Sequence, residues 1–159
     1  MEKYSIIEIV DMTIEKEEIR RDFYSEAAKR FNRQKMKDLF RELSEWESIH
    51  IEKVNKLKEK LNEPKMIDSS LGELKAYLRS VVDSKLYNTT SMGDFVASIA
   101  NENDAIDQAI SFEKDAVLFF SEFLELSLFG EIGLIEQLRD EEKKHIVYLM
   151  QLKEEFGKE

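Results

Sequence analysis

The only two histidines of the chain each follow a glutamate by three residues. Glu47 and His50 form one pair, and Glu142 and His145 form the other. Residues at i and i+3 lie on one face of a helix, one turn apart, so each pair can present a carboxylate and an imidazole to the same ion. This mixture of oxygen and nitrogen ligands suits iron or manganese, whereas zinc prefers fewer and softer ligands. The two pairs therefore predict metal ligands.

Two further glutamates interrupt apolar helical stripes at inward positions. Glu17 precedes Tyr24 by two turns on the first stripe, and Glu113 follows Ile110 on a later one. An unpaired carboxylate in a protein core costs several kcal/mol, but two divalent cations would cancel the charge of four. We therefore expect two metal ions held by six residues: Glu17, Glu47, His50, Glu113, Glu142 and His145. The metal-free alternative is that these glutamates are protonated or face water.

The predicted ligands fall in two similar halves of the chain. Glu17 and Glu47 are separated by nearly the same number of residues as Glu113 and Glu142, and the halves repeat after about 95 residues. This predicts an internal repeat of two helical hairpins, residues 3–61 and 103–156, related by a pseudo-twofold axis. Such an axis would bring the four glutamates and two histidines to one level of the core.

Four helices must position these residues. Apolar residues recur at spacings of three and four over residues 3–31, 34–61, 103–128 and 134–156. Pro64 ends the second stretch, and two glycines near residue 130 break the third. The connection of about forty residues between the hairpins holds an amphipathic piece (71–86), a polar loop (88–91) and a short helix (94–100). The pattern predicts an all-α fold, a ferritin-like antiparallel four-helix bundle with a long crossover.

Composition limits what the protein can be. With 159 residues the chain forms one domain, residues 1–159, and its net charge of −10 argues against binding nucleic acid or an anionic membrane. It contains no cysteine, which excludes disulfides, thiolate nucleophiles and iron–sulfur clusters. No apolar run is long enough to span a bilayer and no signal sequence is evident, so we expect a cytoplasmic protein.

Several neighbouring residues compete for the same roles. Glu15 and Glu18 are rivals of Glu17, and heptad phase disfavours both. The same phase places Arg21 on the inward stripe, where it either pairs with a ligand carboxylate or extends to the surface. Tyr24 could donate a hydrogen bond to a ligand carboxylate across the bundle, or be an ordinary core aromatic.

Two adjacent glutamates of the last helix, Glu141 and Glu142, are likewise alternative ligands. Glu141 precedes His145 by four residues and is an alternative ligand to Glu142. The repeat favours Glu142, because the residue equivalent to Glu141 in the first half is Trp46. We expect Trp46 itself to pack at a helix–helix or subunit contact.

These motifs resemble the rubrerythrin-like branch of the ferritin-like di-iron carboxylate proteins. The resemblance covers most of the chain and rests on the Glu17–Tyr24 spacing, the two Glu-x-x-His pairs, and Glu113 leading into Phe119 and Phe120. It implies that Glu17 and Glu113 are terminal ligands, one for each iron. It further implies that Glu47 and Glu142 bridge the irons and that His50 and His145 each cap one.

The resemblance also implies an activity. The cofactor would be two iron ions, with manganese possible and no haem, and the reaction would be reduction of hydrogen peroxide. Rubrerythrins carry an extra carboxylate three residues after the third-helix ligand, where this chain has Ala116. Oxidation of Fe(II) by oxygen, as in a ferroxidase or iron-binding ferritin-like protein, therefore stays open, as does a non-catalytic metal-binding bundle. Without cysteine, a peroxidase of this kind needs an external, rubredoxin-like electron donor.

The third helix carries more aromatic residues than one face requires. We expect a homodimer built on residues 71–86 and on this aromatic surplus: Phe119, Phe120, Phe123 and Phe129.

Overall fold

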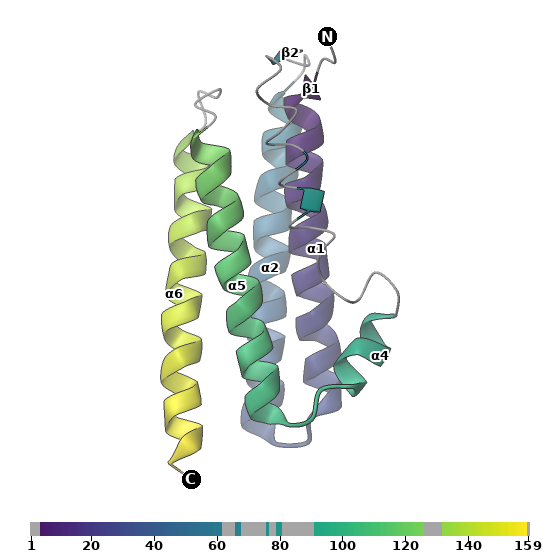
Figure 1. The fold of residues 1–159 in the computed structure, drawn as a ribbon, viewed down its shortest axis with the longest axis vertical. Coiled ribbons are helices and arrows are strands. Elements are labelled where there is room, and N and C mark those ends of the chain that lie inside the picture. The colour runs from purple at the N-terminus through teal and green to yellow at the C-terminus, as the bar shows by residue number, and fades with distance from the viewer. Residues whose placement is uncertain are drawn as a thin grey trace.

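The computed structural model describes residues 4–61, 66–67, 76, 79–80, 91–125 and 132–158. Four long helices dominate it: α1 (Ile6–Arg30), α2 (Gln34–Lys60), α5 (Glu102–Glu125) and α6 (Ile132–Gly157). Helices α1 and α2 form one antiparallel hairpin and α5 and α6 form the other (Figure 1). The predicted all-α four-helix bundle is confirmed.

The helix ends have local causes. Asn101 caps α5, because its side-chain oxygen accepts a hydrogen bond from the Asp104 amide at 2.9 Å. Lys58 and Lys60 lie in the last turn of α2, where positive charge is favourable. The sequence pattern placed the ends of the four long helices within three residues of those observed. Residues 126–128, which it assigned to the third helix, lie outside the described part of the chain.

The crossover contributes one described helix, α4 (Met92–Ala97). Ser91 caps it by accepting a hydrogen bond from the Asp94 amide at 3.1 Å. Helix α4 packs against α1, with Val96 buried, so the predicted short helix at 94–100 exists but begins and ends earlier. Most of the amphipathic piece predicted at 71–86 lies outside the described residues.

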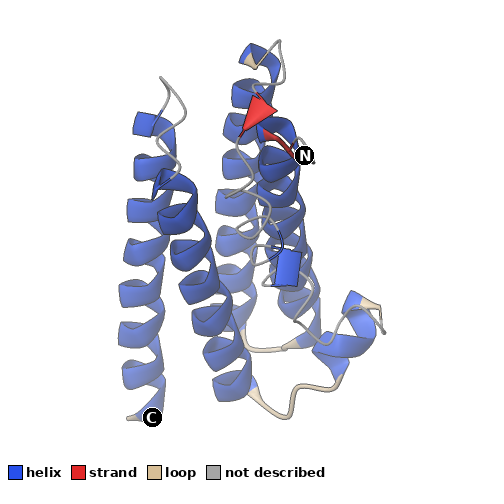
Figure 2. Ribbon diagram, turned by 45° about the horizontal axis from the view of Figure 1, so that its top comes forward, coloured by secondary structure: helices blue, strands red, loops and turns tan. Residues whose placement is uncertain are grey.

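A two-residue β-pairing joins the N-terminal end of the bundle to the crossover. Strand β1 (Tyr4–Ser5) pairs antiparallel with β2 (Met66–Ile67), as Figure 2 shows in red. Two residues are too few to produce a recognisable alternation in the sequence. None of the described helices is long and apolar enough to cross a membrane.

The core consists of two apolar clusters with a charged level between them. One cluster is built around Ile9, Val54 and Phe120, and the other around Phe23, Phe40 and Phe112. Along each long helix, the predicted ligands come between the residues of these two clusters. The charged level is therefore closed off on both sides by packed aromatic and aliphatic side chains.

Candidate metal centre

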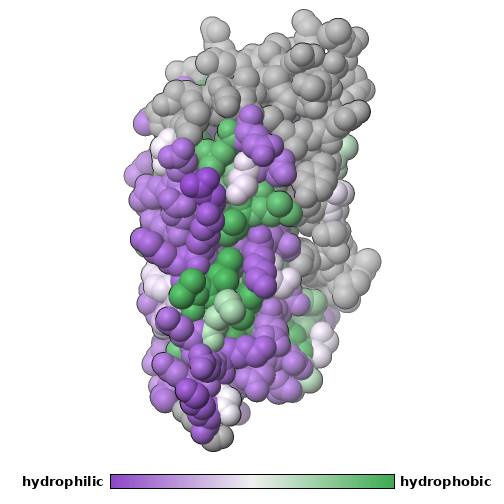
Figure 3. Space-filling model, turned by 60° about the vertical axis from the view of Figure 1, so that its left-hand side comes forward, coloured by the Kyte–Doolittle hydropathy of each residue, from purple (hydrophilic) through white to green (hydrophobic). Residues whose placement is uncertain are grey.

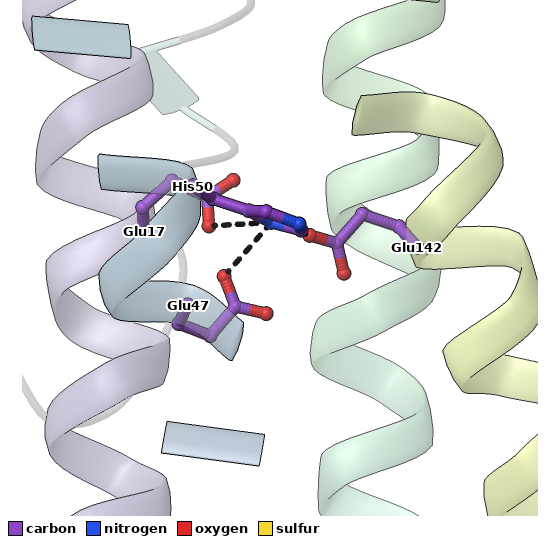
Figure 4. Close-up of side chains that lie close together, drawn as sticks. All are labelled: Glu17, Glu47, His50 and Glu142. Atoms are coloured by element: carbon purple, nitrogen blue, oxygen red, sulfur yellow. Dashed lines mark ion pairs between the residues drawn. The ribbon is translucent and has the colours of Figure 1, made fainter. Parts of the chain in front are cut away.

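The six predicted ligands come together in two overlapping groups. One group is Glu17, Glu47, His50 and Glu142; the other is Glu47, Glu113, Glu142 and His145. Within each group, every residue offers a ligand atom less than 4.8 Å from those of the others. Figure 4 shows the first group, with His50 extending from α2 toward Glu142 on α6. Two ions that share two carboxylates require this arrangement.

Many buried ligand atoms in these groups have no hydrogen-bond partner among the described residues. They include both carboxylate oxygens of Glu17, one oxygen each of Glu47, Glu113 and Glu142, and Nδ1 of His50. Glu17 Oε1 still has an ionic partner in Arg20, and Glu142 Oε1 and His50 Nδ1 lie beside each other. For the remaining atoms, the lack of a partner in a core costs about 1–3 kcal/mol each, and more for charged groups. Because these atoms lie together rather than scattered, the residues present fit a pair of bound cations.

His50 is held from both sides of its ring. Its Nδ1 lies 2.7 Å from Glu142 Oε1 and 3.7 Å from oxygens of Glu17 and Glu47, so this nitrogen faces the carboxylates. Its Nε2 lies 2.6 Å from Glu141 Oε2. A histidine that binds metal commonly donates its other N–H to a carboxylate, which fixes the tautomer and the ring orientation. Glu141 is thus placed to orient His50, whereas its rival Glu142 is fully buried among the ligands.

His145 has a different neighbour. Its Nδ1 lies 3.3 Å from Glu142 Oε2 and 3.7 Å from Glu113 Oε2, and its ring stacks on Trp46 with centroids 4.5 Å apart. Trp46 and Glu141 occupy equivalent positions in the repeat, and each contacts the histidine of the other hairpin. The two histidines are therefore contacted from equivalent positions, one by a carboxylate and the other by an aromatic ring. Trp46 packs between helices, as predicted.

The sequence pattern did not identify Arg20, which lies among the buried ligands between the two apolar clusters. Arg21, for which pairing with a ligand and extension to the surface were both open, is 37% exposed and pairs with Asp22, so it extends to the surface. Arg20, by contrast, is only 1% exposed. Arg20 Nη2 contacts Glu17 Oε1, and lies 3.4 Å from Glu47 Oε2 and 3.7 Å from Glu142 Oε1. The i, i+3 spacing from Glu17, which is also the spacing of the Glu-x-x-His pairs, makes Arg20 a candidate for this face, as the i, i+4 spacing makes Arg21 one.

Tyr24 reaches across the bundle from α1 to α5. Its hydroxyl donates a hydrogen bond to Glu113 Oε1 at 2.5 Å, and the side chain is fully buried. The two rivals of Glu17 in the sequence, Glu15 and Glu18, are exposed. The heptad phase therefore selected the inward glutamate of α1 correctly.

The buried ligands differ in the direction in which their pKa values are shifted. Burial raises the pKa of Glu17 to about 8, against the lowering effect of Arg20. Burial also acts to raise the pKa of Glu142, but Arg20 and the two histidines outweigh it and hold that pKa well below its usual value. Burial acts to lower the pKa of His50, and the carboxylates around it outweigh that effect and raise it. Without metal, protons on Glu17 and His50 therefore supply part of the missing positive charge.

A pocket of about 280 Å³ opens between α2 and α6 beside the histidines. Its lining is made by Trp46, Ile49, His50, Lys53, Glu141 and His145. With the α6 side brought forward, apolar side chains form a strip between hydrophilic borders on this side of the molecule (Figure 3). The pocket gives small molecules a way from solvent to both imidazole rings.

Comparison with known families agrees with this geometry. The family model described as Rubrerythrin matches residues 8–153, which include all six predicted ligands. Neither the comparison with curated proteins nor the comparison with solved structures gives a significant match. The chain therefore belongs to the rubrerythrin family, within the ferritin-like di-iron carboxylate superfamily.

Proposed function

We propose that the protein is a di-iron oxidoreductase that reduces hydrogen peroxide to water. The observation that carries this proposal is the pair of buried ligand groups that share Glu47 and Glu142. When bound by these residues, two redox-active ions would provide the two electrons of the reaction, in which one peroxide, two electrons and two protons give two waters. The family of the chain supports a di-iron centre, and the choice of iron over manganese is part of the proposal.

The chain's own residues hold and shield this centre. One metal position would be held by Glu17 and His50, and the other by Glu113 and His145. Glu47 and Glu142 belong to both metal positions. The apolar clusters on either side exclude water, which strengthens the attraction between ligands and ions. The pocket between α2 and α6 admits a molecule as small as peroxide or oxygen.

A ferroxidase is the second candidate, in which oxygen oxidises Fe(II). The buried residue three positions after Glu113 is Ala116, where a rubrerythrin peroxidase would carry an additional carboxylate. The remaining ligand set is symmetric between the two positions. A symmetric set without the extra carboxylate favours this alternative.

The electron donor and the assembly belong to the same proposal. Turnover as a peroxidase requires an external one-electron donor, rubredoxin-like, because the sequence has no cysteine for a second iron centre.

A homodimer remains a prediction. The argument from surplus aromatics no longer supports it, since Phe119, Phe120 and Phe123 are buried in the chain's own core and Phe129 lies outside the described residues.

The test combines metal analysis with rapid mixing. Protein loaded with Fe(II) should contain two irons per chain, and the His50→Ala/His145→Ala double variant should contain fewer. Stopped-flow mixing of the loaded protein with peroxide or oxygen then separates the candidates. Faster oxidation by peroxide supports the peroxidase, and faster oxidation by oxygen with continued Fe(II) uptake supports the ferroxidase. Absence of reaction with both oxidants would leave a structural metal-binding bundle.

A further inference from the structure

The metal centre contains a buried cation of its own, and this cation is unevenly placed. Arg20 Nη2 contacts Glu17, which belongs to one metal position only, as well as the shared Glu47 and Glu142. No ion pair joins Arg20 to Glu113 or His145 among the described residues. The residue equivalent to Arg20 in the second half is Ala116, which is buried and uncharged. Among the described residues, the repeat thus places an arginine beside one metal position and an alanine at the equivalent place beside the other.

Counting charges shows what this does to metal binding. Metal binding displaces the protons of the ligands. The four deprotonated carboxylates and one guanidinium then carry a net charge of −3, which becomes −1 with one divalent ion and +1 with the second. Without the guanidinium the same series is −4, −2 and zero. The second ion therefore enters a site with half the negative charge that the carboxylates alone would provide. The loss is largest near Glu17, where the guanidinium lies closest.

One nearby group acts in the opposite direction. Glu141 contacts His50 and adds a negative charge beside the same metal position, but its side chain is 30% exposed and Lys53 lies 3.9 Å from it. Charges near water interact about four times more weakly than buried ones at the same distance, for dielectric constants of about 80 and 20. Arg20, at 1% exposed, therefore outweighs Glu141.

We propose that Arg20 makes metal loading sequential, so that the position of Glu113 and His145 fills first and the position of Glu17 and His50 fills second and more weakly. The inference rests on the two-metal site of the proposed function and adds an order to it. Arg20 is a positioning residue here, since it acts through the ligand carboxylates and not on a substrate.

Titration of the metal-free protein with Co(II), followed by calorimetry and by the visible bands of the bound ion, tests this order. In any dinuclear site, repulsion between the two ions makes the second dissociation constant larger than the first. The contribution of Arg20 is therefore measured by comparing variants with wild type. Arg20→Met should narrow the ratio of the two dissociation constants at least tenfold, mainly by tightening the second step. Arg20→Lys keeps the charge and should keep most of the ratio. Arg21→Met, one residue away and exposed, is the matched control and should change neither step.

Histidine variants assign the steps to positions. His145→Ala should abolish the tight step and His50→Ala the weak one, with circular dichroism confirming that each variant remains helical. An unchanged ratio in Arg20→Met, an equal effect of Arg20→Lys and Arg20→Met, or loss of the tight step in His50→Ala would overturn the inference while leaving a two-metal site intact. If wild-type protein binds no Co(II), Mn(II) or Fe(II), the proposed function itself fails.

Discussion

The hydrogen bond from Tyr24 to Glu113 provides a direct test of the centre's construction. Replacing Tyr24 with Phe removes one hydroxyl and keeps the ring that packs against Phe23 and Phe40. In the metal-free protein, Glu113 would then have no donor on either oxygen, because its Oε2 already has none among the described residues. The variant isolates a single interaction in a fully buried setting.

The expected cost follows from the chemistry of the pair. A hydrogen bond to a charged group contributes about 1.5–3 kcal/mol to stability, and for a chain of this size each kcal/mol shifts the melting temperature by about 2–4 °C. We therefore expect metal-free Tyr24→Phe to melt about 3–12 °C below wild type. A partner that orients a metal ligand is worth about 10–100-fold in affinity, so Co(II) binding at the Glu113 position should weaken by that factor.

Thermal unfolding by circular dichroism and Co(II) titration measure the two effects. Tyr148→Phe is the matched control, since Tyr148 lies at the side of Trp46 and not among the buried ligands. Equal melting temperatures and equal affinities for the two variants would show that the Tyr24 hydroxyl does not support Glu113.

Three further predictions concern other parts of the molecule. Since the pKa of Glu17 rises to about 8 on folding from an ordinary value of 4.5, this carboxyl alone should cost the metal-free protein about 4 kcal/mol of stability between pH 5 and pH 8. The raised pKa of His50 acts in the same direction above pH 6.5, so a flat profile in urea unfolding would contradict this. Glu141→Gln should weaken Co(II) binding at the His50 position about tenfold and leave the other position unchanged, as a two-step titration would show. Leu138→Ala should cost about 2–4 kcal/mol in urea unfolding because Leu138 is fully buried, whereas Leu118→Ala, at a residue 42% exposed, should cost well under half of that.

Two patterns made the ligand groups predictable. The Glu-x-x-His spacing defines a helix face without knowledge of any other element, and the repeat fixes which glutamate of α1 and of α5 faces that pair. Heptad phase alone then separated Glu17 from its exposed neighbours. The spacing and the heptad phase are local, and the repeat appears when the two halves of the chain are compared, which explains why a single sequence was sufficient.

The sequence pattern did not predict features that depend on a shift of one residue along a helix or on a tertiary contact. Positions three and four after Glu17 both lie near the inward face, and only packing against α2 and α6 shows that Arg20 rather than Arg21 is buried. The role of Glu141 depends on a histidine 91 residues away in the chain. The surplus phenylalanines of α5 suggested a partner, but the bundle itself buries them.

The distribution of ligands over the two hairpins affects how the chain folds. Each hairpin closes through contacts between residues near in sequence, which form fast, and each carries three of the six ligands. Docking of the hairpins is then a late event that resembles dimerisation of two linked subunits, opposed by the repulsion of their carboxylates. Bound ions convert that repulsion into attraction, because Glu47 and Glu142 come from different hairpins and belong to both positions. Metal should therefore slow the separation of the hairpins and lengthen the lifetime of the folded protein.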